Sequence, residues 1–215
     1  MKTLFDLRSL MALCLALSTT WAAAQPANEA HAITGFRSAQ FGMDAAQVRA
    51  AIANDFKPVP DAVSVLENPT ERTQIILLRL PTLEPGPGPA SVSYILGATS
   101  KRLIHVNVVW KTDGNPPDDT RNKMAAAGVM LSNYFRNLAW RPGTTLSGVA
   151  EGGRGVVLFA GLDPKNAALE VRVSGVATTA IEGVAAKPEG AAQLLLSYIS
   201  DIQKPDVAVI KAGTF

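Results

Sequence analysis

Residues that most often build metal and nucleophilic sites are scarce in this chain. Among its 215 residues there is one cysteine, Cys14, and there are two histidines, His31 and His105. Cys14 lies in an apolar run near the N-terminus, so the chain beyond that run offers no disulfide, cysteine nucleophile or cysteine metal site. The histidines are far apart in sequence, which excludes a two-histidine metal site on one ordered element. We therefore expect no cofactor.

A strong net charge of either sign is also missing. Lysine and arginine together number 20, aspartate and glutamate number 18, and the formal net charge is +2. Nucleic-acid binding requires basic residues that cluster on one surface. The longest basic run is Lys101-Arg102, and we therefore expect no nucleic-acid partner.

The first residues have the layout of a secretory signal. Lys2 and Arg8 supply positive charge, residues 10–17 are apolar, and small residues follow them. We expect a signal peptide over residues 1–24 and an exported protein, periplasmic in a bacterium with two membranes. The apolar run is too short for a comfortable membrane span. Membrane association would therefore require a lipid on Cys14, whose large apolar neighbour disfavours that modification.

The remaining length suits one domain with a sizeable core. Residues 25–34 are polar, alanine-rich and without period, so we predict a disordered leader there. A single α+β domain is predicted over residues 35–203. Residues 204–215 form a C-terminal tail, which is either loose or an edge strand.

Residues 92–110 carry the clearest structural signal, a β-hairpin. Apolar and polar residues alternate on both arms, as they do in half-buried strands. The expected register places Val92 opposite Val106 and Ser93 opposite His105. A slip by one residue would bury the polar set, so burial should select this register. The apolar side chains then face the core, and the face with serine, histidine and asparagine is open or lightly covered.

Helices are predicted on three stretches. Asp44 and Gln47 have the spacing of a capping box for a helix that ends near Asp55. Apolar residues recur every three or four positions over residues 119–139, which predicts the longest helix, packed across the sheet. Residues 188–202 also read as a helix, with proline in the first turn.

Short strands lie between these helices. Residues 73–80 are almost continuously apolar, which suggests a central strand covered on both faces. The proline-rich residues 81–89 can form neither a ladder nor a helix and read as a surface loop. Further strands are predicted over residues 63–67, 145–149, 156–160 and 169–173. The predicted fold class is α+β: a mainly antiparallel sheet of two meanders, with one long helix packed across it and shorter helices before and after.

The first predicted helix opens with Gly42-Met43-Asp44, and Val48 follows. This pattern resembles the helix opening of small exported α+β proteins of the BamE/SmpA outer-membrane assembly type. The resemblance implies an exported α+β fold and covers only the start of this helix. The chain departs from that family because it is considerably longer and lacks a good lipid-anchor cysteine.

Ser93 and His105 combine the residue types of a nucleophile and a base in the expected register. Together they would suit a periplasmic hydrolase. A working pair also needs an orienting group and a pocket, which two strand residues do not supply. We favour a solvated hairpin face and keep the hydrolase as an alternative.

A loop rich in acidic and amide oxygens precedes the long predicted helix. Its Asp113, Asn115, Asp118 and Asp119 are residue types that bind hard cations such as Ca²⁺. The loop lacks EF-hand spacing and contains two prolines. We favour capping of the helix by Asp118 or Asp119, with a weak cation site as the alternative.

Aromatic residues around the long helix suggest a third possibility, a small-ligand carrier. Trp110 and Trp140 would line a cleft between sheet and helix, although aromatic residues at such spacing usually belong to the core. In that cleft, Arg141 and Arg79 are the candidates for holding an anionic ligand.

No catalytic arrangement outweighs its simpler structural explanation. We therefore expect a non-catalytic periplasmic binding or accessory module that acts through its sheet face or through residues 81–89. Its partner would be a periplasmic protein or a small molecule, and whether the chain is an enzyme stays open.

Overall fold

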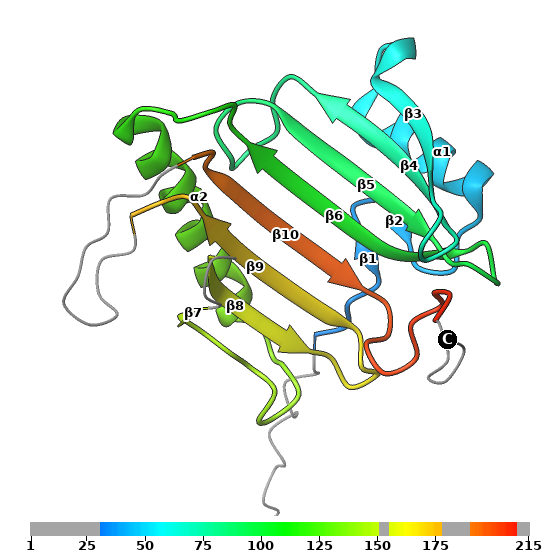
Figure 1. Cartoon of the computed structure of the whole chain (residues 1–215). Helices are drawn as coiled ribbons and strands as arrows, with labels where there is room; N and C mark the ends of the chain where they lie inside the picture. Colours follow the sequence, from blue (N-terminus) through cyan, green and yellow to red (C-terminus); the bar gives the residue numbers. More distant parts are fainter. Residues whose placement is uncertain (1–30, 151–154, 178–189, 210–215) are drawn as a thin grey trace, which may run out of the picture.

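The computed structural model describes residues 31–150, 155–177 and 190–209. They form one eight-stranded antiparallel sheet with two α-helices packed on one side (Figure 1). The α+β class and the antiparallel sheet are thereby confirmed. The predicted signal peptide and most of the predicted leader lie outside these residues. Within them, no helix has the length and apolar character needed to cross a bilayer.

The elements follow a regular order along the chain. The helices are α1 (Ala45–Phe56), the short 3₁₀ helix η1 (Pro60–Ala62) and α2 (Asp118–Arg136). The strands are β1 (Gly35–Phe36), β2 (Ala39–Gln40), β3 (Val63–Asn68), β4 (Thr73–Leu80), β5 (Ala90–Leu96), β6 (Leu103–Lys111), β7 (Val149–Ala150), β8 (Val156–Leu162), β9 (Ala168–Ser174) and β10 (Gln193–Ile199). Strand order in the large sheet is β3-β4-β5-β6-β10-β9-β8-β7, and β1 and β2 form a separate pair. An α-helix followed by four strands thus occurs twice, and the last strands of the two halves meet at the centre.

The helix α1 begins where its capping signal predicts. Asp44 Oδ1 accepts a hydrogen bond from the Gln47 amide at 3.0 Å, and Gln47 Oε1 accepts one from the Asp44 amide at 3.0 Å. Both bonds satisfy amides that a helix N-terminus leaves without partners. Lys57 then takes a left-handed conformation, with φ of 45°, and ends the helix. Val48 and Ile52 are buried against the sheet side.

The helix α2 lies across the second half of the sheet, on β8, β9 and β10. Met124 and Phe135 are buried on its sheet side, at the spacing that predicted the helix. Gly128 allows a close approach, because a Cβ there would lie 2.8 Å from side-chain atoms of both Leu158 and Val173. A larger residue at this position would push the helix away from the strands.

The hairpin of β5 and β6 is present, but its predicted register is wrong by two residues. Ser93 pairs with Asn107 and not with the predicted His105. The register becomes irregular at the turn, where Leu96 lies opposite Leu103. Because side chains alternate with period two, a shift of two residues keeps the regularly paired side chains on their predicted faces. At the irregular end the prediction is wrong, because Leu103 is buried and Ile104, which we predicted in the core, is only partly buried. The buried face comprises Val92, Tyr94, Val106, Val108 and Trp110.

Residues 193–199 form the strand β10, where we predicted a helix over residues 188–202. This strand lies between β6 and β9 at the centre of the sheet, so the predicted helix after the sheet is wrong. Leucine favours helices, and the segment alone does not distinguish the two structures. Pairing on both sides satisfies its backbone, while Leu194 and Leu196 enter the core and Ser197 points to the other face. Tertiary pairing here overrides local propensity.

Two other strands differ from their predicted place or length. The strand β4 is second from the edge of the sheet, between β3 and β5, and not central. Its apolar Ile75 and Leu77 are partly buried on the side away from the helices, which explains the continuous apolar run. The strand predicted over residues 145–149 is reduced to β7, preceded by a single bridge between Leu146 and Ala160.

Both ends of the described chain are held by hydrogen bonds to distant residues. The Ile33 amide donates to Asp163 Oδ2 at 3.1 Å, so the ordered chain begins before the predicted domain boundary. Near the other end, Asp206 accepts hydrogen bonds from the amides of Thr99 and Ser100 at 2.9 and 2.8 Å. The described part of the tail therefore caps the turn between β5 and β6.

Candidate functional site

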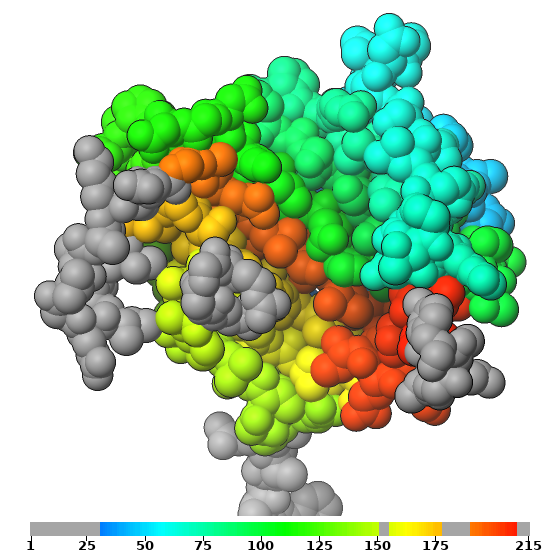
Figure 2. Space-filling model, in the orientation of Figure 1, coloured from blue at the N-terminus to red at the C-terminus, as the bar shows by residue number. Residues whose placement is uncertain are grey.

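Among the described residues, one face of the sheet carries no helix, because α1 and α2 both pack on the other side (Figure 1). We call it the open face. Figure 2 shows it in space-filling form, with β6 in green beside β10 in orange and β9 in yellow. Its side chains alternate with buried core residues, and most are themselves partly buried. The open face comprises Ile75, Leu77 and Arg79 on β4, Ser91, Ser93 and Ile95 on β5, His105, Asn107, Val109 and Lys111 on β6, Gln193, Leu195, Ser197 and Ile199 on β10, and Glu170 and Arg172 on β9.

The strand registers arrange the open face in rows of different polarity. Asn107 and Ser197 are direct cross-strand neighbours in a polar row. In the next row, His105 lies between Ile95 and Ile199 on the two adjoining strands. Directly opposed residues are in contact on a sheet face. The imidazole is therefore flanked by isoleucines and lies beside the polar row.

His105 is the centre of a hydrogen-bonded network on this face. Its Nε2 lies 2.9 Å from Asn107 Oδ1 and 2.8 Å from Ser197 Oγ. Burial lowers the pKa of the imidazole below its usual value, and the hydrogen bond to Asn107 offsets part of that effect. The ring is therefore neutral at neutral pH. The network links β6 to β10 through their side chains.

Ser197, and not the predicted Ser93, is the serine that reaches His105. Sequence reasoning missed it because the segment was read as a helix. Asn107 Oδ1 can only accept, so the hydrogen bond between it and the ring requires the tautomer that carries the proton on Nε2. A nitrogen that carries a proton cannot accept another from the Ser197 hydroxyl, as a general base must. The arrangement suits a structural support of the face better than a nucleophile and its base.

A pocket of about 220 Å³ opens at one end of the open face, where the proline-rich loop joins β5. Its lining includes two basic residues, a serine and apolar side chains: Arg79, Lys111, Ser91, Leu80, Pro89 and Val109. We call it the basic pocket. Arg79 was a predicted anion-binding residue, whereas Lys111 was not. The alternation of side chains along β6 continues beyond Trp110, and extending it by one residue would have placed Lys111 on the open face.

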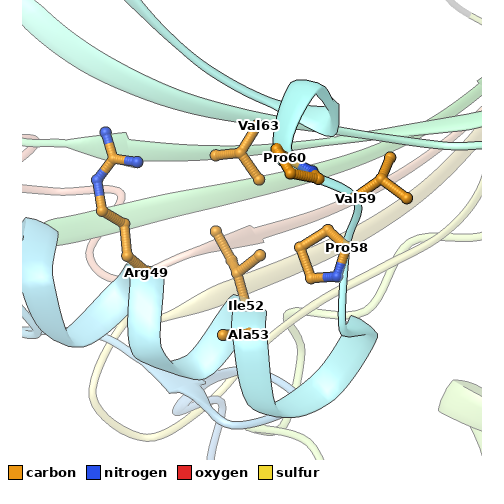
Figure 3. A pocket seen from close by; sticks show the side chains of 7 residues that line it. All are labelled: Arg49, Ile52, Ala53, Pro58, Val59, Pro60 and Val63. Atoms are coloured by element: carbon orange, nitrogen blue, oxygen red, sulfur yellow. The ribbon is translucent and has the colours of Figure 1, made fainter.

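A second pocket, of about 190 Å³, lies between α1 and the segment that leads into β3. Figure 3 shows Arg49 on one side of it, Pro58 and Val59 on the other, and Ile52 between them. Ile52 is buried and Val59 is exposed, so the pocket is an apolar hollow with one basic residue at its rim. It is separate from the open face.

Trp110 and Trp140, which we predicted to line one cleft, have different neighbours in the structure. Trp110 is only 1% exposed, and its Nε1 donates to a carbonyl of the proline-rich loop at 2.6 Å. Trp140 packs against Phe159, with ring centroids 5.2 Å apart. Arg141 donates to the Asn166 side chain at 2.5 Å, away from Arg79 on the open face. Each ring thus belongs to a different part of the core.

Two of the four residues of the predicted cation site, Asn115 and Asp119, have other partners. The Asn115 side chain accepts a hydrogen bond from Arg121, and Asp119 pairs with Lys123 at 2.7 Å. The predicted capping by Asp118 or Asp119 is wrong, because the N-cap residue of α2 is Pro117 and no side chain caps the helix. Asp118 and Asp119 instead lie in the first turn of α2, where carboxylates interact favourably with the helix dipole. Within the described ranges, no three histidine, cysteine or acidic residues lie close enough to hold a metal ion.

No family model, curated protein or solved structure matches this chain. The interpretation of the open face therefore depends on its own geometry and chemistry.

Proposed function

We propose that this protein is an exported, non-catalytic binding module whose open face receives a partner. The observation that carries the proposal is the His105 network: the imidazole lies between Ile95 and Ile199 and is hydrogen-bonded to Asn107 and Ser197 of the neighbouring polar row. Protein interfaces typically combine apolar contacts with a limited set of hydrogen-bonding groups. A face whose side chains are already held in place loses little entropy on binding.

The proline-rich loop supports the same surface. Trp110 Nε1 donates to the Leu83 carbonyl at 2.6 Å and so holds the loop beside the sheet. Pro89, at the end of the loop, lines the basic pocket. The two elements that the sequence suggested for binding, the sheet face and residues 81–89, therefore adjoin. A partner on the open face would contact both.

Export is proposed from the charge and hydropathy pattern of residues 1–24. The resemblance of the segment around Gly42 to BamE/SmpA proteins also predicts an exported protein. Expression with the native N-terminus, followed by osmotic release of the periplasm and N-terminal sequencing, tests this part. A chain that begins near Gln25 in the periplasmic fraction is expected, and an uncleaved chain in the cytoplasm would contradict it.

Site-specific photocrosslinking in the periplasm tests the binding role. A crosslinker at Ser93, on the open face, should give a discrete adduct. The same crosslinker at Met130, which is 61% exposed on the outer side of α2, should not. Ile199→Gln should weaken the Ser93 adduct while circular dichroism shows an unchanged fold. Equal adducts from both positions, or none from Ser93, would contradict the proposal.

The alternative function is a hydrolase, and one observation favours it. Ser197 Oγ lies 2.8 Å from His105 Nε2, within reach for proton transfer in the tautomer that carries its proton on Nδ1. In this role Ser197 replaces the predicted Ser93. Its test is the comparison of the parent chain with Ser197→Ala described in the Discussion.

A further inference from the structure

The basic pocket lies where three strands end side by side. Arg79 on β4, Ser91 on β5 and Val109 on β6 are cross-strand partners in one row of the open face. Lys111 follows Val109 by two residues and therefore lies on the same face. Pro89 of the proline-rich loop adds the remaining wall. Two cations, a hydroxyl and an apolar surface thus converge on one small volume.

The two cations of this pocket have no acidic partner among the described residues. Arg79 donates to Ser64 Oγ at 3.4 Å, and Lys111 forms no ion pair within these ranges. None of the described residues that line the pocket is acidic. On the same face, by contrast, Arg172 bonds Glu170 at 2.8 Å. Uncompensated cations around a concave surface produce a positive potential that attracts anions.

The apolar wall of the pocket is held by the core beneath it. Trp110 Nε1 bonds the Leu83 carbonyl at 2.6 Å, and Gly86 packs so closely on the indole that a Cβ would lie 2.3 Å from the ring. Ala90, the residue after Pro89, is paired with both Leu80 and Trp110. Pro89 is therefore held in place before any ligand binds, which lowers the entropic cost of binding.

We propose that the basic pocket binds a phosphate monoester that carries a small apolar group. The phosphate lies between Arg79 and Lys111, and the apolar group lies against Pro89 and Val109. A phosphate monoester carries between one and two negative charges at neutral pH, which two cations balance. Arginine also matches phosphate oxygens through paired hydrogen bonds. The inference rests on the proposed function, because it places this ligand on the open face.

The size of the pocket limits the ligand. Its volume of about 220 Å³ is smaller than the roughly 300–1,000 Å³ of sites for drug-sized molecules. Only a small free ester, or the terminal phosphate of a larger molecule such as a lipid, fits. A free ester and a lipid headgroup present the same phosphate group to the pocket, and vesicle binding distinguishes them.

Titration of ¹⁵N-labelled protein, residues 25–215, with phenyl phosphate tests the site by NMR. Amide signals of Arg79, Ser91 and Lys111 should shift, whereas that of Arg49 in the second pocket should not. Inorganic phosphate and benzyl alcohol should each bind at least about fivefold more weakly, since each lacks one of the two contacts. Equal affinity for inorganic phosphate would indicate an adventitious ion only and would overturn the proposal.

Matched charge variants show whether the pocket itself binds the ester. Arg79→Gln and Lys111→Gln should each weaken phenyl phosphate binding about fivefold, as expected for exposed charge pairs. Lys204→Gln removes the same charge from the exposed tail and should leave the affinity unchanged. Equal losses in all three variants would indicate non-specific attraction and would overturn the proposal.

Vesicles of phosphatidylcholine with phosphatidic acid identify the source of the phosphate. Vesicle binding that Arg79→Gln weakens and Lys204→Gln does not weaken indicates a lipid headgroup. Binding of phenyl phosphate without vesicle binding indicates a free ester. If phenyl phosphate causes no NMR shifts but the Ser93 crosslink still forms, the phosphate-binding proposal is overturned and the partner-binding role is not. If phenyl phosphate causes NMR shifts but no Ser93 crosslink forms, the partner-binding role is overturned and phosphate binding is not.

Discussion

His105 on β6 and Ser197 on β10 lie 2.8 Å apart, Nε2 to Oγ, although 92 residues separate them in sequence. The contact joins the last strands of the two halves of the sheet, each of which consists of four strands that follow an α-helix. It therefore lies at the centre of the sheet, on the face that no described helix covers. The polar centre of the open face exists only because both halves contribute to it.

Stability should decrease as the solution is acidified, because His105 is a partly buried neutral ring. Its pKa is lowered in the folded state by burial, so the unfolded chain binds the proton more tightly. This contribution is fully present above about pH 6.5 and is lost as the pH falls below that value. Urea unfolding of His105→Gln should depend less on pH between about pH 7.5 and pH 5 than that of the parent chain. Ser93→Ala should retain the parent's pH dependence, and the same pH dependence in parent and His105→Gln would refute the explanation.

Ser197→Ala should lower the free energy of unfolding by about 1 kcal/mol, because it removes one buried hydrogen-bond partner of His105. Hydrolysis of p-nitrophenyl acetate should be unchanged, since Nε2 carries the proton in this network. Urea denaturation and absorbance at the nitrophenolate band measure the two effects. Ser93→Ala, on the same face, should cost less than about 0.5 kcal/mol. A hydrolysis rate that depends on Ser197 would favour the hydrolase.

Gly86→Ala should destabilise the protein by about 1–3 kcal/mol, because the added methyl overlaps the Trp110 ring. The loop would have to move, so phenyl phosphate binding in the basic pocket should weaken as well. Thermal unfolding and the NMR titration measure both consequences. Thr82→Ala, at an exposed position of the same loop, is the control and should change neither. If Gly86→Ala has the parent's unfolding temperature and the parent's affinity for phenyl phosphate, the loop is not held by this contact.

Asp206→Asn should loosen the turn between β5 and β6. Hydrogen bonds from Ser100 and Thr99 lower the pKa of Asp206, so its carboxylate stabilises the turn at neutral pH and less so below about pH 4. Amide hydrogen exchange at Thr99 and Ser100 should accelerate in the variant. Asp201→Asn, which affects a carboxylate bonded within the tail, should leave both rates unchanged. Equal acceleration by the two variants would contradict a direct role for Asp206.

Local signals predicted the helices α1 and α2 well. The capping box of Asp44 and Gln47 spans one helical turn, and the apolar stripe of α2 repeats within a single segment. Such signals need no knowledge of the rest of the chain. The faces of β5 and β6 were also predicted correctly where the pairing is regular, because alternation is a property of neighbouring residues.

The candidate site was only partly predictable. His105, Ser93 and Arg79 were identified as polar or basic residues of the sheet, but His105 was given the wrong neighbour. Its serine partner lies on β10, a leucine-rich segment that suits a helix or a strand equally well on its own. Lys111 was not predicted as a site residue, because it follows Trp110, the last residue of the predicted hairpin.

The sequence by itself determined where α1 and α2 lie and which side chains of the β5–β6 hairpin face the core, because periodicity and capping act over a few neighbouring residues. Only the tertiary structure decided that residues 193–199 form a strand, since the hydrogen bonds that stabilise it come from β6 and β9. The open face, its His105 network and the basic pocket depend on contacts between strands far apart in the chain. Side-chain patterns within one segment do not encode those contacts.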